Sequence, residues 1–292
     1  MSALIRAFFD ELTKTVSYLV VDQGSKQCAI IDPVLDYDHR NGAISTRSAD
    51  ALLAVIAADQ LTVAWILETH VHADHLSSAQ YLKNQTGAPI GVGEHICEVQ
   101  RLFAHAFNLT EMNCDGSEFD RLFRDGERLP LGESEIEVMH TPGHTPACVS
   151  YRIGDAVFVG DTLFMPDYGT ARTDFPGGDA ATLYRSIRHL LSLPPQTRVF
   201  LCHDYKAVGR DRYVWESTVS EQRELNVHAN GSVTEAAFVA MRQSRDATLS
   251  TPDLLLPSIQ VNVRAGRLPA AEANGIRYLK TPLRLPDSLA RL

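Results

Sequence analysis

Short apolar runs separated by polar turns dominate the first third of the chain. Residues 17–21 and 28–32 are two such runs, and the polar segment 22–26 between them predicts a β-hairpin. Apolar positions at helical spacing then alternate with one further apolar run. In chain order, these elements are expected as a helix at 47–59, a strand at 63–67, and helices at 75–85 and 94–107. This part of the chain therefore predicts a strand hairpin followed by alternating helices and strands.

A similar order of elements begins again in the middle of the chain. Residues 149–153 and 156–159 are apolar runs on either side of Gly154 and Asp155, which predicts a second hairpin. The other elements expected here are strands at 135–139 and 198–201, and helices at 179–191, 214–225 and 233–242. Two strand-rich blocks, each followed by helices, are most simply explained by two sheets packed face to face with helices outside. The expected fold class is therefore α/β, an αββα sandwich.

The C-terminal fifty residues show a different pattern, rich in proline and leucine and with little periodicity. We therefore assign residues 1–245 to one catalytic domain and residues 246–292 to an extended tail packed on it. The same tail could equally form a contact between two copies of the chain in a homodimer.

Composition and charge narrow the classes of function. Of the 292 residues, 45% are hydrophobic and 22% charged, which is ordinary for a globular protein with a sizeable core. A formal net charge of −9 makes nucleic-acid binding a poor hypothesis, since a phosphate backbone requires a basic face. No apolar stretch approaches the roughly 20 residues that a membrane-spanning helix needs, and no secretory signal pattern is present. Five scattered cysteines without a Cys-x-x-Cys motif fit a reduced cytoplasmic protein.

The densest group of potential metal ligands follows the predicted strand 63–67. His70, His72, Asp74 and His75 fall within six residues. Alternate side chains of an extended segment lie on one face, so His70 and His72 can converge on one point, while the other two can face a neighbouring point. Imidazole and carboxylate groups suit zinc, iron or manganese. One isolated histidine is usually structural, but four ligands this close together predict a metal site.

Three further potential ligands follow other predicted strands. His144 comes after 135–139, Asp161 after 156–159, and His203 after 198–201. Loops at strand ends are where a rigid sheet presents catalytic groups. Gly143 and Gly160 fit tight backbone turns beside a ligand. The remaining histidines belong to no such motif and are expected to be structural or solvated: His39, His95, His105, His140, His189 and His228.

Together these motifs resemble the metallo-β-lactamase superfamily over about residues 15 to 225. Narrower motifs resemble its persulfide dioxygenase branch, also called sulfur dioxygenases of the ethylmalonic encephalopathy type. They lie at 141–145 (Thr-Pro-Gly-His-Thr), 160–164 (Gly-Asp-Thr-Leu-Phe), 171–175 (Ala-Arg-Thr-Asp-Phe), 202–205 (Cys-His-Asp-Tyr) and 257–266. The chain departs from mitochondrial members in its longer loop 163–170. The resemblance implies the αββα metallo-β-lactamase fold with the metal at one edge of the sandwich.

The resemblance also implies a cofactor and a reaction. Carried over by motif, one Fe(II) per chain is held by His70, His144 and Asp161, a set that suits O2 chemistry. The implied reaction oxidises glutathione persulfide with O2 to sulfite and glutathione. The other superfamily ligands would stay outside the iron's coordination or face a vacant second site: His72, Asp74, His75 and His203. The alternative is a glyoxalase II-like thioester hydrolase with two metals, although that group typically has His-Glu-Tyr where this chain has His-Asp-Tyr at 203–205.

An acidic chain that binds glutathione needs local groups to receive its two carboxylates. The cationic and phenolic groups near the metal loops in sequence are Arg172, Tyr205, Lys206, Arg212, Tyr213 and Tyr168. We expect these residues to bind substrate. For Arg172, pairing with Asp174 or Asp167 to fix its loop is an equally good interpretation.

Overall fold

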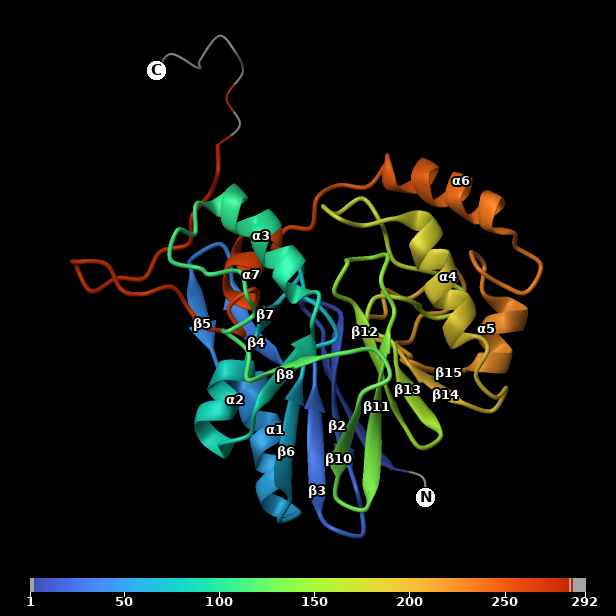
Figure 1. Cartoon of the computed structure of the whole chain (residues 1–292), viewed down its shortest axis with the longest axis horizontal. Coiled ribbons are helices and arrows are strands. Elements are labelled where there is room, and N and C mark those ends of the chain that lie inside the picture. The colour runs from blue at the N-terminus through green and yellow to red at the C-terminus, as the bar shows by residue number, and fades with distance from the viewer. Residues whose placement is uncertain (1–2, 284, 286–292) are drawn as a thin grey trace.

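Two mixed sheets form the centre of the computed structural model, which describes residues 3–283 and 285 (Figure 1). The first has the strand order β1-β2-β3-β6-β8-β9 and the second the order β10-β11-β12-β13-β14-β15. The strands of the first sheet are β1 (Leu4–Asp10), β2 (Thr15–Val21), β3 (Gln27–Ile31), β6 (Thr62–Leu67), β8 (Ile90–Gly93) and β9 (Arg121–Phe123). Those of the second are β10 (Arg128–Leu131), β11 (Ser134–His140), β12 (Val149–Ile153), β13 (Ala156–Phe158), β14 (Arg198–Phe200) and β15 (Glu216–Thr218). A small third sheet has the order β5 (Ala43–Ser45), β4 (Val34–Asp38) and β7 (Leu76–Ser77).

Helices cover the outer faces of both central sheets (Figure 1). On the side of the first sheet lie α1 (Arg47–Ala58), α2 (Ala79–Thr86), α3 (Ile96–Phe107) and α7 (Leu255–Asn262). On the side of the second lie α4 (Ala180–Leu190), α5 (Val219–Leu225) and α6 (Glu235–Asp246). The predicted αββα metallo-β-lactamase sandwich is confirmed. Among the described residues, no helix is long and apolar enough to cross a membrane.

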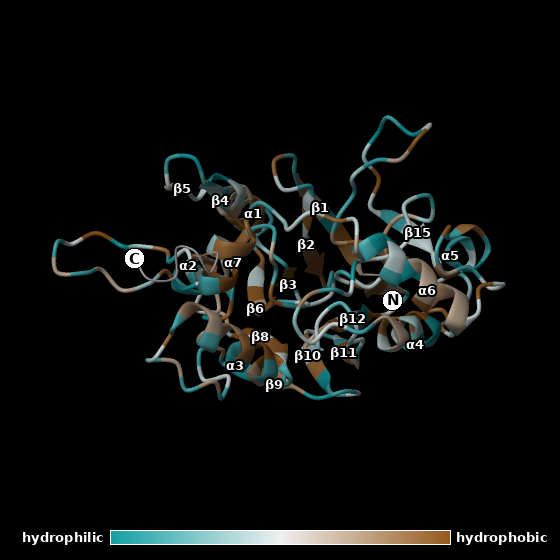
Figure 2. Ribbon diagram, turned by 90° about the horizontal axis from the view of Figure 1, so that it is seen from above, coloured by the Kyte–Doolittle hydropathy of each residue, from teal (hydrophilic) through white to brown (hydrophobic). Residues whose placement is uncertain are grey.

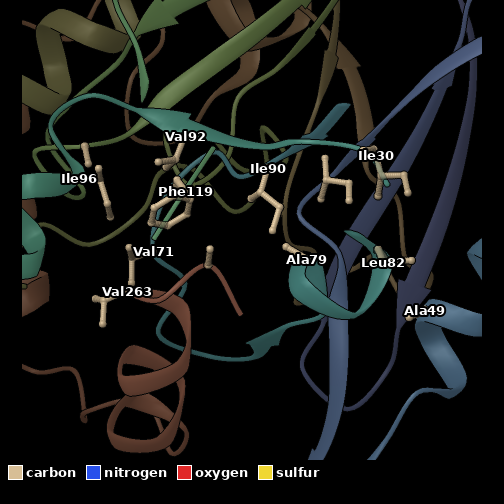
Figure 3. Close-up of a cluster of buried hydrophobic side chains, with 14 of the residues drawn as sticks. Ile30, Ala49, Val71, Ala79, Leu82, Ile90, Val92, Ile96, Phe119 and Val263 are labelled. Atoms are coloured by element: carbon tan, nitrogen blue, oxygen red, sulfur yellow. The ribbon is translucent and has the colours of Figure 1, made fainter. Parts of the chain in front are cut away.

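The apolar runs of the sequence are long because the central strands are buried on both faces. In β2, Tyr18 and Val20 point between the two sheets, whereas Leu19 and Val21 belong to the core beneath the helices. Figure 3 shows the core between the first sheet and its helices, where Ile30 and other strand residues meet side chains of the surrounding helices. Seen from above, hydrophobic strands lie inside and hydrophilic segments outside (Figure 2). A strand buried on both faces loses the alternation of a half-exposed strand, which explains the continuous apolar pattern.

The expected hairpins and most helices are present, but several regions differ from the prediction. Strand β1 was not predicted; among the described residues it pairs only with β2, and its mainly apolar side chains are mostly half-buried. Strands β4, β5, β8, β9 and β10 were also not predicted. The helix expected at 75–85 begins only at Ala79, because Leu76 and Ser77 pair with β4. The first part of the helix expected at 214–225 is strand β15, which pairs with β14 before a Thr218–Glu221 capping box starts α5.

The C-terminal segment is not extended throughout, because residues 255–262 form α7. Its buried residues run without interruption from Ser258 to Asn262, so the helix has no exposed face to create a periodic pattern. Ile259 and Val263 belong to the same core as the first sheet and helices α1 to α3. The division of the chain at residue 245 stays a prediction.

Candidate metal centre

Loops that follow four different strands meet at one edge of the sandwich. His70 follows β6, His144 follows β11, Asp161 follows β13 and His203 follows β14. All four side chains are buried, with His203 fully so and Asp161 the most exposed at 9%. The structure brings these four residues close together, with contacts of 3.3–4.0 Å between Asp161 and the three histidines; their role as metal ligands stays a prediction.

His70, His144 and Asp161 form one compact group. The Nε2 atoms of His70 and His144 lie 4.0 Å and 3.7 Å from Oδ2 of Asp161, respectively. One ligand atom from each residue lies within 4.8 Å of the others. Nε2 of His70 and Oδ1 of Asp161 are buried and have no hydrogen-bond partner among the described residues. Buried polar atoms without partners are costly, so this group fits a metal ion that would satisfy them.

The far side of each imidazole is held by a hydrogen bond. Nδ1 of His70 lies 3.0 Å from Oγ1 of Thr69, which in turn donates to Asp32. Nδ1 of His144 lies 2.8 Å from the backbone oxygen of Arg172. A hydrogen bond at Nδ1 fixes the ring and leaves Nε2 as the coordinating atom, which is the usual arrangement of a metal-bound histidine.

Two glycines make the close approach of the loops possible, as their motif positions predict. Gly143 and Gly160 have φ angles of +135° and +49°, a region that favours glycine. A Cβ atom at Gly143 would lie 2.3 Å from the Leu183 backbone, and one at Gly160 would lie 2.6 Å from Oγ1 of Thr69. Each glycine therefore lets a ligand-bearing loop pass directly over a neighbouring element.

The other potential ligands lie around this group and also contact one another. Nε2 of His203 lies 3.2 Å from Oδ2 of Asp74 and 3.3 Å from Oδ1 of Asp161. Nδ1 of His75 lies 3.6 Å from Oδ1 of Asp74. His72, Asp74 and His75 also have ligand atoms within 4.8 Å of one another, so the geometry alone permits a second metal.

His72 differs from the other histidines because two buried carboxylates face it. Its Nε2 lies 3.0 Å from Oδ1 of Asp32 and 3.5 Å from Oε2 of Glu68. Burial lowers the pKa of His72, but the Asp32 carboxylate outweighs it and raises the pKa well above the ordinary value. For His70, burial and the neighbouring histidines hold the pKa well below the ordinary value, which keeps the ring neutral and able to coordinate. Asp32 and Glu68 therefore favour the charged form of His72, whereas the surroundings of His70 favour its neutral form.

Helix α7 supports the metal loop, and sequence reasoning did not assign it this role. The side-chain nitrogen of Asn262 donates to the backbone oxygens of His72 and His75, at 2.9 Å and 2.7 Å. Its side-chain oxygen accepts from the backbone nitrogen of Ser77 at 2.8 Å. One buried amide thus satisfies three backbone groups of the loop. The signal in the sequence is a single asparagine far from the ligands, with no spacing that relates it to them.

A cavity of about 300 Å³ opens above the metal group. Its lining includes His144, Asp161, Phe164, Tyr168, Thr170, Arg172, Phe175, Tyr205, Arg242 and Arg245. Tyr168 and Tyr205 lie with their ring centroids 5.2 Å apart and form part of an aromatic wall with Phe164. The volume and the mainly apolar wall with a few polar groups are typical of a small-molecule site.

Three of the six residues that we expected to bind substrate line this cavity: Arg172, Tyr205 and Tyr168. Arg172 also pairs with both carboxylate oxygens of Asp174 at 2.6 Å, so the interpretation that it fixes its loop is supported. Its guanidinium lies over Phe175, whose ring packs edge-on against His144. Arg172 therefore holds a metal ligand in position through both its backbone oxygen and this aromatic contact.

The structure does not bring Lys206, Arg212 or Tyr213 to the lining of the cavity. Lys206 donates to Asp211 at 2.8 Å, and Tyr213 is the partner of Lys14 at 2.9 Å. The cation that does tie this loop to the cavity wall is Arg210, which sequence reasoning missed. A role of the first three residues in substrate binding stays a prediction that the cavity does not support.

Two arginines of α6, Arg242 and Arg245, line the cavity and were not predicted. Arg242 pairs with Asp246 at 2.8 Å and donates to the backbone oxygen of Thr170 at 3.1 Å. No motif relates α6 to the metal loops, so only the three-dimensional arrangement shows that it closes the cavity.

Comparison with known proteins gives the family of the chain. A family model with the description "Metallo-beta-lactamase superfamily" matches residues 11–203. A probable metallo-hydrolase of Burkholderia pseudomallei is 56% identical over 96% of this chain and 98% of its own length. Glyoxylase B2 of Dictyostelium discoideum is 51% identical over 96% of this chain and 97% of its own length. Beta-lactamase hydrolase-like proteins of Xylella fastidiosa and Agrobacterium fabrum are longer, and this chain spans 64–66% of their length.

More distant relatives belong to the persulfide dioxygenase branch. The human mitochondrial persulfide dioxygenase ETHE1 is 30% identical over 90% of this chain and 89% of its own length. The crystal structure of ETHE1 from Myxococcus xanthus superposes with a TM-score of 0.72 and 29% identity, covering 90% of this chain and all of that one. The chain belongs to the metallo-β-lactamase superfamily and is a homologue of its ETHE1 persulfide dioxygenases.

Proposed function

We propose that the chain is a persulfide dioxygenase that holds one Fe(II) and oxidises glutathione persulfide to sulfite and glutathione. The observation that carries this proposal is the compact group of His70, His144 and Asp161, with buried ligand atoms that lack other partners. Two imidazoles and one carboxylate with open positions are typical of non-haem iron oxygenases. The homology to ETHE1, named persulfide dioxygenase in human, supports the same reaction.

The balanced reaction converts one persulfide, one O2 and one water into glutathione, sulfite and two protons. Bound between His70, His144 and Asp161, Fe(II) supplies the redox chemistry with O2. The residues of the chain hold the metal, orient the persulfide and keep bulk water out. Burial raises the pKa of Tyr168, so its phenol stays neutral and offers a hydrogen-bond donor in the cavity.

The position of His72 favours one metal over two. A second metal in this superfamily would need ligands from the set His72, Asp74, His75 and His203. In this chain His72 is held beside Asp32 at 3.0 Å and close to Glu68 at 3.5 Å, both within the protein interior. Recruiting His72 to a metal would separate it from these carboxylates and leave the buried Asp32 without its cationic partner.

Thioester hydrolysis by a glyoxalase II-like binuclear centre is the second candidate. It is favoured by the closeness of the His72, Asp74 and His75 ligand atoms. It is also favoured by the 51% identity to Glyoxylase B2, which exceeds the identity to human ETHE1. Both candidates use the same cavity and a glutathione carrier, and they differ in the metal and in the need for O2.

An oxygen-electrode assay on anaerobically iron-loaded protein distinguishes the two candidates. We expect O2 uptake that starts only when glutathione persulfide is added, with sulfite formed in equal amount. Zinc-loaded protein is the control and should consume no O2. Hydrolysis of S-lactoylglutathione without O2 uptake on the persulfide would overturn the proposal in favour of the thioesterase.

A further inference from the structure

The three arginines that line the cavity differ in how their charges are matched. Arg172 is paired with Asp174 and Arg242 with Asp246. Arg245 is exposed and, within the described part of the chain, has no carboxylate partner. Arg245 is therefore the cavity cation whose charge is still available to a ligand.

The position of Arg245 over the cavity is fixed by buried contacts of α6. Asp246 accepts hydrogen bonds from the backbone nitrogen and the hydroxyl of Thr173, at 2.9 Å and 3.0 Å. Arg242, one turn before Asp246, binds the backbone oxygen of Thr170. Residues three apart on a helix share a face, so the contacts that hold Arg242 against the loop also direct Arg245 toward it.

The charge of Arg245 also affects the pKa of His228, whose side chain contacts Thr170 of the cavity lining. Burial together with the charges of Arg242 and Arg245 lowers the pKa of His228 to about 4. His228 accepts a hydrogen bond from the backbone nitrogen of Thr170, which itself lines the cavity. Arg245 itself lines the cavity together with Thr170, and it is also exposed to solvent.

We propose that Arg245 forms a carboxylate-binding subsite at the open end of the cavity, opposite the metal group. A guanidinium presents paired donors that match the two oxygens of a carboxylate. A cavity of about 300 Å³ is at the small end of ligand sites, which suits a small peptide thiol. The ligand class is thus a small thiol that carries a carboxylate several bonds from its sulfur.

This inference rests on the proposed function in one respect: it takes glutathione to be the molecule that carries the reacting sulfur. Both candidate reactions, persulfide oxidation and thioester hydrolysis, place glutathione in this cavity. A test by binding of glutathione itself is therefore independent of which reaction occurs. If the O2 assay fails and Arg245 still controls glutathione binding, the reaction was assigned wrongly and the subsite stands.

The test is calorimetric binding to iron-loaded protein under anaerobic conditions. The ligands are glutathione and its diethyl ester, which lacks both carboxylate charges. The variants are Arg245→Ala and, as a matched control, Arg101→Ala, which removes an exposed positive charge of α3 outside the cavity lining. Arg245 is exposed, so the Arg245→Ala variant should fold normally, and its melting temperature checks this.

We expect Arg245→Ala to weaken glutathione binding by about 5- to 20-fold, in the lower range for a charge-assisted contact because the site is open to solvent. The ester should bind equally to wild type and variant, Arg245→Lys should recover part of the loss, and Arg101→Ala should bind glutathione as wild type does. The proposal is overturned if Arg245→Ala binds glutathione normally, or if the loss is as large for the ester. It is also overturned if the wild type does not prefer glutathione to the ester.

Discussion

The metal end and the open end of the same cavity are built in different ways. At the metal end, buried side chains follow β6, β11 and β13, and each histidine is fixed by a hydrogen bond at Nδ1. At the open end, the lining side chains come from the loop 163–175 and from α6, and they range from buried Arg242 through half-buried Arg172 to exposed Arg245. The first region depends on the rigid sheets, whereas the second depends on hydrogen bonds between the loop and α6.

The metal end holds features that the superfamily can share, whereas the open end holds features that suit one substrate. Strand-end ligands can serve hydrolases and oxygenases alike, because the sheets position them whatever covers the cavity. The loop and α6 decide the size and charge of the ligand. Substitutions at the metal end should therefore remove metal and activity together, and those at the open end should change binding or stability while the metal remains.

The largest effect is expected at Asp161. Asp161→Ala removes the only carboxylate of the group formed with His70 and His144. Loss of a residue that merely orients a metal ligand typically lowers metal affinity by about 10- to 100-fold. Loss of the ligand itself should therefore weaken iron binding by more than about a hundredfold. His203→Ala is the matched control and should cost about tenfold at most, because His203 contacts Asp161 from the side of Asp74. Iron titration measures both. Equal loss of iron in the two variants would contradict the mononuclear assignment.

A smaller effect, on stability, is expected where α7 supports the metal loop. Asn262→Ala leaves two backbone oxygens and one backbone nitrogen without their partner, and the free energy of unfolding should fall by about 2–4 kcal/mol. Gln243→Ala, at an exposed position of α6, is the control and should change it by less than about 0.5 kcal/mol. Chemical denaturation measures both. An unchanged midpoint for Asn262→Ala would show that α7 does not hold the loop.

The open end should show a pH dependence that comes from His228. Burial and the charges of Arg242 and Arg245 lower its pKa from 6.5 to about 4. Between pH 6.5 and pH 4 the unfolded chain binds a proton at His228 that the folded protein does not. The stability that comes from neutral His228 is therefore fully present above pH 6.5 and is lost as the pH falls toward 4. The loss is on the order of 3 kcal/mol at most. His228→Asn, which keeps an acceptor for Thr170, should lose less stability than wild type over that range; parallel pH curves would contradict this origin.

The smallest effect is expected at Lys206. Its amino group pairs with the fully exposed Asp211 and lies outside the cavity lining. Lys206→Ala should change KM for glutathione persulfide by less than about twofold, the usual range for a surface pair. Steady-state kinetics with confirmed iron content measures this. A tenfold rise in KM would show that Lys206 binds the substrate, as expected from the sequence alone.

The metal end could be predicted because its signal is local. Four ligands within residues 70–75 directly follow an apolar strand, and Gly143 and Gly160 mark the turns beside two more ligands. Each of these patterns can be read within a few residues. The fold followed from the same apolar runs, because strands buried on both faces leave a continuous signal.

The open end could not be predicted because its contacts join segments without any common motif. The loop 204–213 offers Lys206, Arg210 and Arg212 as cations, and the sequence does not show which one turns inward. In the structure Arg210 pairs with Asp204 and Asp167, because the backbone turns at Lys206 with a φ of +62° and bridges Ala207 to Arg210. Helix α7 was missed for another reason, since a helix buried on all sides has no amphipathic pattern.

The metal content of the active protein tests the central claim most directly. Elemental analysis of anaerobically purified chain, combined with its specific activity, gives the number and identity of the ions that support turnover. We predict one iron per chain at full activity, held by His70, His144 and Asp161, with His72 remaining beside Asp32. Two tightly bound zinc ions per active chain would contradict the account, because His72 would then have to leave the buried carboxylates to serve a second metal.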